Sequence, residues 1–193
     1  MNRHLLTAAC AIYVALVVYA SWMPFDVDLN PSEVAARRQQ LWRCWPFESG
    51  GRLSKSDVLS NFMLYVVMGG LLATRLSMAR KVPAVVAGVV TPVFCTGLSA
   101  TIEIGQTMMI SRVPSAQDVL MNTFGGLCGA LIGATVGPGI WHRVCGVLRR
   151  LWRRNPAALA AGAVLAAVAA DAWFPLWPTL LTKEIWQSAK RSV

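Results

Sequence analysis

Charged residues are scarce in this chain. They make up 14% of the sequence, where a soluble globular domain usually carries about a quarter. With only 2 histidines present, a histidine-rich metal or haem site is not expected. The 5 cysteines are scattered, and their odd number and spacing fit neither a disulfide framework nor a metal site. The sequence therefore predicts no cofactor and no metal ion.

Long apolar runs take the place of charge. Hydrophobic residues make up 55% of the chain. Charge is absent from residues 5–25, 58–74, 82–102 and 119–141, and a further run, 155–182, is broken only by Asp171. A helix needs about 20 apolar residues to cross a membrane. We predict an all-α, polytopic membrane helix bundle with about five transmembrane helices, forming a single membrane domain over residues 1–193.

The first apolar run could also be a secretory signal peptide. The apolar core of a signal peptide is about 7–15 residues long, whereas this run extends from residue 5 to residue 25. We therefore interpret it as a retained transmembrane helix.

The net charge is +9, but no basic pattern favours nucleic acid. Basic residues gather instead between the fourth and fifth runs: Arg143, Arg149, Arg150, Arg153 and Arg154. Such a cluster holds a loop on the cytoplasmic side and contacts anionic lipid. With this cluster included, the two sides carry equal numbers of Lys and Arg. The compactness of the cluster and the shared Trp–Pro endings of the first and fifth runs, at Trp22 and Trp173, therefore guide the choice. We predict a multi-pass protein of the cytoplasmic (inner) membrane with a cytoplasmic N-terminus.

A polar segment, residues 26–56, separates the first two runs. Within it, Asn30 followed by Pro31 predicts the start of a helix, with the asparagine as cap and the proline at the first helical position. Val34, Leu41, Trp42 and Trp45 fall broadly on one side of that helix. An interfacial helix on the membrane and an ordinary loop with exposed tryptophans both fit this segment.

The pattern Ser-x-x-Asp-Val-Leu-x-Asn occurs twice, beginning at Ser54 and at Ser115, each time where an apolar run starts. We predict two parallel two-helix repeats, related by an axis along the membrane normal, followed by a C-terminal helix over about 155–182. A helix cap alone explains the Ser and the Asp of each copy. It does not explain Asn61 and Asn122, which lie one turn deeper, where polar groups are costly unless they face protein or water.

Further polar residues precede the second copy. Glu103 and Gln106 share one helix face, and Arg112 follows in a short connection. These groups could form a bowl of carboxylates around a cation that grips a phosphate or carboxylate, or they could form a structural ion pair. The candidate polar site comprises Asp57, Asn61, Glu103, Gln106, Arg112, Asp118 and Asn122. No catalytic residue is assigned.

Glycines recur every four residues in the fourth run, at Gly125, Gly129, Gly133 and Gly137. A glycine face of this kind lets a neighbouring helix approach closely. We interpret it as a packing surface of the glycine-zipper type rather than a ligand contact.

The series Asp57…Asn61, Glu103-x-x-Gln106, Arg112 and Asp118-x-x-x-Asn122 resembles the VanZ-like family of membrane proteins. The resemblance covers about residues 54–133. The chain departs from it at Val67, where the family often has proline, and at Ser111, where glycine is common. The resemblance implies a cell-envelope protein in a family named for low-level resistance to the glycopeptide teicoplanin. No agreed biochemical activity comes with it.

We favour the interpretation that this is a non-enzymatic protein that binds a membrane lipid, a polyprenyl-phosphate or lipid-linked saccharide, at the outer interface. Arg112 would take the anion, and Asn61, Asn122 and Gln106 the hydroxyls or amides. An intramembrane hydrolase or transferase with Glu103 and Asp118 as acid–base pair is the alternative, although no serine–histidine or serine–lysine arrangement supports it. A third hypothesis is that the protein is a small proton-coupled transporter. Nucleic acid is not an expected partner.

Overall fold

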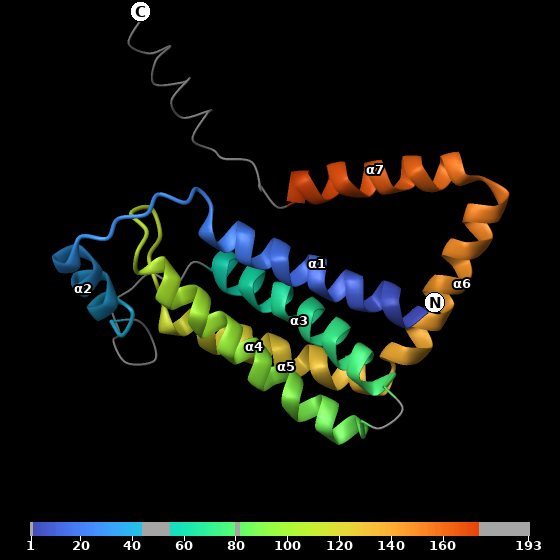
Figure 1. Cartoon of the computed structure of the whole chain (residues 1–193), viewed down its shortest axis with the longest axis horizontal. Helices are drawn as coiled ribbons and strands as arrows, with labels where there is room; N and C mark the ends of the chain where they lie inside the picture. Colours follow the sequence, from blue (N-terminus) through green and yellow to red (C-terminus); the bar gives the residue numbers. More distant parts are fainter. Residues whose placement is uncertain (1, 44–54, 80–81, 174–193) are drawn as a thin grey trace, which may run out of the picture. The chain divides into compact units, whose positions relative to one another are not determined.

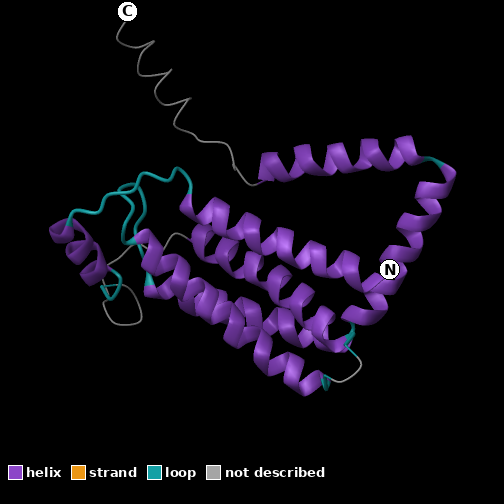
Figure 2. Ribbon diagram, viewed as in Figure 1, coloured by secondary structure: helices purple, strands orange, loops and turns teal. Residues whose placement is uncertain are grey.

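A computed structural model describes residues 2–43, 55–79 and 82–173. This part of the chain is helical, without named strands (Figure 2), which confirms the all-α prediction. The helices are α1 (Asn2–Trp22), α2 (Pro31–Gln40), α3 (Lys55–Ser77), α4 (Ala84–Gln106), α5 (Ala116–Thr135), α6 (Gly137–Arg154) and α7 (Pro156–Trp173).

Three of the described helices, α1, α3 and α4, are long and apolar enough to cross a membrane. The pair α5 and α6 passes the same test together but is bent by 72°, which gives up to 4 spans if the pair is counted as one. The fifth apolar run falls partly on α7 and partly on residues 174–182, which lie outside the described residues. Five spans therefore stay a prediction, whereas a multi-pass membrane protein is supported.

The bend between α5 and α6 lies inside the run 119–141. The sequence predicts that run to be one span, because no charge interrupts it. The break falls at Val136, and Pro138 stands in the first turn of α6. Proline has no backbone N–H, so it cannot continue the hydrogen-bond ladder of a preceding helix, but it is tolerated in a first turn. The chain therefore ends one helix and begins another in a new direction.

Contacts divide the chain into two units, residues 1–143 and 144–193. In the first unit α1, α3, α4 and α5 lie side by side (Figure 1). The figure shows α1 and α4 running one way and α3 and α5 the other. Two parallel two-helix repeats require these directions, and the symmetry between them stays a prediction.

The helices α3 and α5 approach each other along their backbones. A Cβ atom added to Gly129 would collide with the carbonyl oxygen of Val66, and one added to Gly133 would collide with that of Gly70. Thr74 joins the two helices, because its hydroxyl lies 2.6 Å from the carbonyl oxygen of Gly70 and 3.2 Å from that of Gly133. Close backbone contact of this kind is what associates helices in lipid, where apolar burial gives no net drive.

A small apolar core joins α1, α3 and α4, with Val17, Tyr65, Met68, Cys95 and Ile102 at its centre. The outer faces of the helices are also apolar: for example, Val93 of α4 is 66% exposed and Leu131 of α5 is 58% exposed. An apolar exterior around a partly polar interior is expected of helices that face lipid.

Two connections pair with each other at the end of the first unit where α1 and α4 finish. The N–H of Asp28 donates to the carbonyl of Met108 at 2.8 Å, and the N–H of Ile110 donates to the carbonyl of Asp26 at 3.1 Å. The carboxylate of Asp26 also accepts from the N–H and the hydroxyl of Ser111, at 2.9 and 3.0 Å. The α1–α2 and α4–α5 connections are therefore hydrogen-bonded to each other and together cover this end of the bundle.

The helix α2 is attached to the same two connections. Its start is as predicted: Asn30 caps it by accepting from the N–H of Ser32, and Pro31 is its first residue. Arg37 pairs with Asp28 at 2.6 Å and donates to the carbonyl of Thr107 at 3.3 Å. The segment is thus an ordered helix tied to the α4–α5 connection.

Candidate functional site

The predicted site residues gather at one end of the first unit, because α3 and α5 begin where α4 ends (Figure 1). Asp57 lies in the first turn of α3, and its side chain is outside the described residues. Asn61 follows it on α3. Glu103 and Gln106 stand in the last turn of α4, and Asp118 and Asn122 stand in the first two turns of α5.

Arg112 is bound to main-chain oxygens in the last turn of α1 and in the residue that follows it. Its Nε donates to the carbonyl of Met23 at 2.9 Å, and its Nη2 donates to the carbonyl of Ala20 at 3.0 Å and also to that of Met23. Carbonyls at a helix C-terminus lack partners within the helix, and a cation there is favoured by the helix dipole. Arg112 therefore fastens the α4–α5 connection to the end of α1.

Gln106 acts on the same helix end. Its Nε2 donates to the carbonyl of Ser21 at 3.0 Å. Beside it, Trp22 packs on Gly105, where an added Cβ would lie 2.9 Å from Cζ2 of the indole. Two polar residues of the sequence pattern, Gln106 and Arg112, thus serve to join α1 to α4.

Glu103 joins the end of α4 to the start of α5. Its side chain is buried, and its Oε2 accepts from the N–H of Ser115, the N-cap residue of α5, at 2.8 Å. Asp118 and Arg112 both lie within electrostatic range of the carboxylate. A negative charge at this place also complements the N-terminal dipole of α5.

The bundle interior next to Glu103 holds two buried polar groups that lack hydrogen-bond partners among the described residues. Asn122 donates through Nδ2 to the hydroxyl of Ser99 at 2.8 Å, but its Oδ1 has no partner. The hydroxyl of Tyr65 has none either, although Ser99, Glu103 and Tyr13 lie near enough to interact with it electrostatically. We name Tyr65, Ser99, Glu103 and Asn122 the interior polar cluster; three helices, α3, α4 and α5, contribute to it.

These unsatisfied atoms indicate which chemical groups would complement the cluster. Leaving a buried polar group unpaired costs about 1–3 kcal/mol. Exchanging the nitrogen and oxygen of the Asn122 amide would not satisfy both atoms, because only one of them faces Ser99 and the other would still lack a partner. A hydroxyl both donates and accepts, so it has the chemistry to pair with the Asn122 amide oxygen or with the Tyr65 hydroxyl.

Asn61 stands near the cluster but makes no hydrogen bond among the described residues. It is half-buried and precedes Tyr65 by one helical turn, hence on the same face of α3. Gly125 of α5 lies directly against the carbonyl of Phe62 of α3, since an added Cβ there would collide with it. This contact gives the register between the two helices. In that register Asn61 and Asn122 stand within about 3 Å of the same level along the helix axes.

The site residues that sequence reasoning missed are Tyr65 and Ser99. Their spacing could have indicated them: Tyr65 follows Asn61 by four residues and Ser99 precedes Glu103 by four, so each shares a helix face with a predicted site residue. A tyrosine and a serine within apolar runs do not by themselves indicate a polar site.

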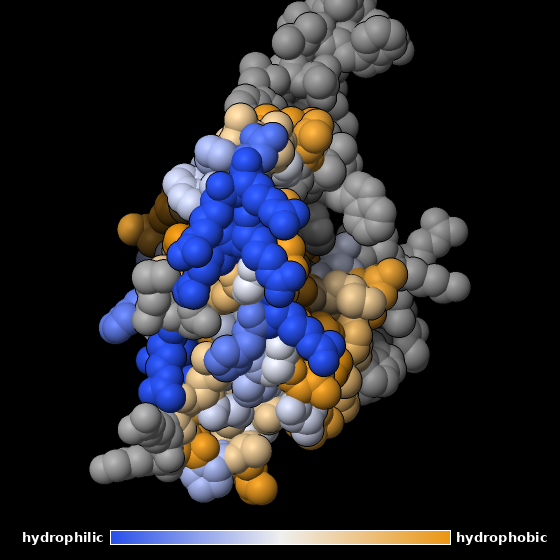
Figure 3. Space-filling model, turned by 90° about the vertical axis from the view of Figure 1, so that its right-hand side faces the viewer, coloured by the Kyte–Doolittle hydropathy of each residue, from blue (hydrophilic) through white to orange (hydrophobic). Residues whose placement is uncertain are grey.

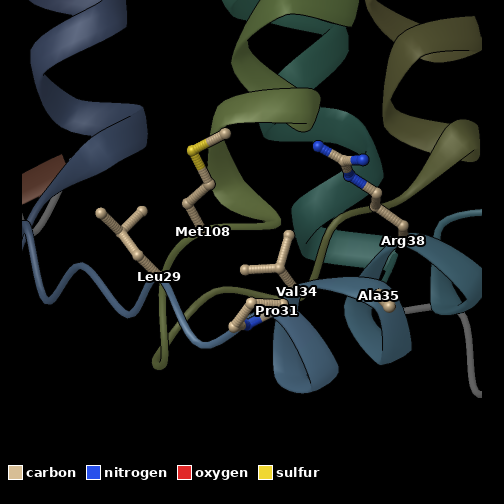
Figure 4. Close-up of a pocket in the computed structure, with 6 residues that line it drawn as sticks. All are labelled: Leu29, Pro31, Val34, Ala35, Arg38 and Met108. Carbon is tan, nitrogen blue, oxygen red and sulfur yellow. The ribbon is translucent and has the colours of Figure 1, made fainter.

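A second feature that the sequence did not indicate is an open hollow of about 450 Å³ between α2 and the α4–α5 connection. Figure 4 shows its lining, which is apolar except for Arg38 and includes Val34 of α2 and Met108 of the α4–α5 connection. Its residues come from separate segments of the chain. Among the described residues, no three His, Cys, Asp or Glu side chains gather where they could hold a metal ion.

Comparison with known proteins gives one family. A family model described as VanZ/LLP1 matches residues 6–137. No curated protein and no solved structure matches the chain. The matched range covers α1 from residue 6 onward and all of α2 to α5, and it ends at the first residue of α6.

Proposed function

Because the chain belongs to the VanZ/LLP1 family and has the apolar helices of a multi-pass membrane protein, we propose that it binds the headgroup of an envelope lipid, a polyprenyl-phosphate or a lipid-linked saccharide. The binding site is the end of the bundle where α3 and α5 begin. One observation carries the proposal: two buried polar groups of the interior polar cluster, on Tyr65 and Asn122, lack partners among the described residues.

Polar groups inside a span are costly and tend to mark function. Here they flank a single residue, Ser99, which accepts from Asn122 and neighbours Tyr65. A saccharide hydroxyl at this point would donate to the amide oxygen and accept from the tyrosine. Asn61, one turn nearer the end of the bundle on α3, offers the next amide to the same headgroup.

A phosphate in the headgroup needs a cation, and Arg112 supplies it in this proposal. The carbonyls of Ala20 and Met23 hold the guanidinium through Nε and Nη2, which fixes its plane. The third nitrogen, Nη1, donates to no described residue and is the group offered to a phosphate oxygen. Such charge-assisted bonds are stronger than neutral ones.

In the same proposal the site faces outward. The N-terminus is then cytoplasmic, α1 and α3 pair as one repeat and α4 and α5 as the other, and α7 begins the fifth span. A role in glycopeptide resistance would follow from occupancy of an envelope lipid rather than from chemistry on the drug.

The test is to purify the protein, identify its bound lipids by mass spectrometry and quantify them in matched variants. Tyr65→Phe removes one unpaired hydroxyl from the cluster and changes nothing else. Thr91→Val is the control, because the Thr91 hydroxyl is also buried and unpaired among the described residues but lies two turns deeper in α4, outside the cluster. Loss of an envelope lipid from the first variant alone supports the proposal, and equal retention in both contradicts it.

Catalysis is separated from binding by Glu103→Gln and Asp118→Asn. Each variant keeps the shape of the side chain and removes its charge. If the lipid stays bound while an envelope-stress or glycopeptide-sensitivity phenotype falls to background, an acid–base pair acting on that lipid replaces simple binding, since proton transfer contributes about 10²–10⁴-fold. If both binding and phenotype persist, the carboxylates only position α5.

A further inference from the structure

The helix α6 separates its basic and apolar side chains onto opposite sides. At about 100° of rotation per residue, its aliphatic residues and its two tryptophans occupy one half of the helix: Ile140, Trp141, Val144, Val147, Leu148, Leu151 and Trp152. The other half holds the basic residues: His142, Arg143, Arg149, Arg150, Arg153 and Arg154. No acidic residue occurs in α6. Figure 3 shows hydrophilic side chains gathered in a band, with apolar ones beside it.

The direction of α6 differs from that of a span. It leaves α5 at 72°, and α5 packs along α3 and α4, which are long and apolar enough to cross the membrane. Transmembrane helices tilt on average by about 20° from the membrane normal. A helix bent by 72° from such a neighbour therefore lies closer to the membrane plane than to the normal.

The chemistry of both faces fits one surface. Helices of this kind insert their apolar side between acyl chains and keep their basic side among the headgroups. Tryptophan is enriched at this depth, and Trp152, which is 64% exposed, stands at the edge of the apolar half. Five arginines without an acidic residue in the same helix are complementary to anionic headgroups and favour them over neutral lipid.

This helix also lies beyond the family domain. The family match ends at residue 137, the first residue of α6. The site that we propose for the envelope lipid belongs to the matched helices. The amphipathic helix is therefore a separate feature of this chain.

We propose that α6 lies in the membrane interface next to the end of α5 and binds anionic phospholipid there. The occupant is the anionic lipid surface itself, with the arginines contacting phosphate groups and the apolar half contacting acyl chains. The helix thus gathers anionic lipid at the end of the bundle opposite the interior polar cluster.

The test uses the full-length protein without its native cysteines, reconstituted in phosphatidylcholine vesicles containing about a third phosphatidylglycerol. A bimane label at Leu148→Cys reports from the apolar half. A label at Gly146→Cys is the matched control in the basic half, where an added Cβ meets nothing within 4 Å. Quenching is measured with acyl-chain doxyl groups carried either on phosphatidylglycerol or on phosphatidylcholine at equal mole fraction.

We expect the label at position 148 to be quenched at least about twofold more by the anionic carrier, and the label at position 146 to be quenched less by either. Replacing Arg149, Arg150, Arg153 and Arg154 with glutamine should abolish the twofold preference, whereas lysine at the same positions should retain it. Absence of quenching at position 148, equal quenching by both carriers, or an unchanged preference in the glutamine variant would each overturn the proposal.

Discussion

Arg112 binds the carbonyl oxygen of Met23 with two of its nitrogens, Nε and Nη2. These residues are 89 positions apart, and the contact joins the α4–α5 connection to the end of α1. The arginine that the sequence pattern singled out as an anion grip therefore already has a structural role, and any ligand role has to be additional to it.

Arg112→Lys separates these two roles. Lysine keeps the charge but loses the planar fork that spans the carbonyls of Ala20 and Met23. We expect the free energy of unfolding to fall by about 1–3 kcal/mol, as for a lost hydrogen bond to a charged group. Thermal unfolding in detergent measures this, with Arg38→Lys as the control. Unchanged stability together with loss of bound lipid would mean that Arg112 serves mainly the ligand.

Glu103→Leu and Glu103→Gln form a second matched pair. Leucine removes the acceptor of the Ser115 N–H, a bond of 2.8 Å in a buried place, and should destabilise the protein by about 1–3 kcal/mol. Glutamine keeps a carbonyl oxygen in the same position, so its unfolding temperature should stay close to that of the unchanged protein. A large loss of stability in the glutamine variant would show that the charge, rather than the acceptor, holds the start of α5.

Gly129→Ala tests the contact between α3 and α5. The added methyl group would meet the backbone of Val66 and Gly70, which cannot turn away as a flexible side chain can. We expect destabilisation of about 1–3 kcal/mol or more from overpacking. Gly97→Ala is the control in α4, where an added Cβ meets nothing within 4 Å. That variant should stabilise the helix by about 0.5–1 kcal/mol, and equal effects at both positions would contradict the close contact.

The attachment of α2 should depend on pH. The N–H of Asn30 and then the side chain of Arg37 hold the pKa of Asp28 below its ordinary value of about 4. Because the folded pKa is the lower one, this stabilisation is present above about pH 4 and is lost as pH falls through the folded value. Hydrogen exchange of α2 should therefore speed up on acidification. In Asp28→Asn the exchange should already be fast at neutral pH and should show less of this acid step.

Orientation is tested with single cysteines in a cysteine-free chain. Ile110→Cys places a thiol in the α4–α5 connection, where the residue is 65% exposed, and Arg153→Cys places one in the basic half of α6. An impermeant thiol reagent applied to intact cells should label the first and spare the second. The reverse pattern would place the candidate site on the cytoplasmic side.

The sequence predicted much of the fold because its main signals are local. Asn30 before Pro31 marked the start of α2, and uncharged runs marked α1, α3 and α4. The bend at Val136 was missed, because an apolar run records the absence of charge and not the continuity of backbone hydrogen bonds. Pro138 carried the information, but a proline after a glycine-rich stretch fits a packed span as well as a break.

The candidate site was predicted in part for a similar reason. Asn122 and Glu103 stood out because amides and carboxylates are rare in apolar runs. Their partners did not. Ser99 is an ordinary residue of a membrane helix, and the groups bound by Arg112 are backbone carbonyls, which leave no trace in the sequence at all.

The glycine contacts between α3 and α5 have a mechanical consequence. Where backbone meets backbone, as at Gly129 and Val66, no side-chain rotamer can readjust, so we expect the two helices to move together as one unit. Helix α4, which contributes Ser99 and Glu103 to the interior polar cluster, contains Pro92, and this proline removes one of its backbone hydrogen bonds. We therefore expect α4, rather than the α3–α5 pair, to be the helix that adjusts when a ligand hydroxyl reaches Asn122.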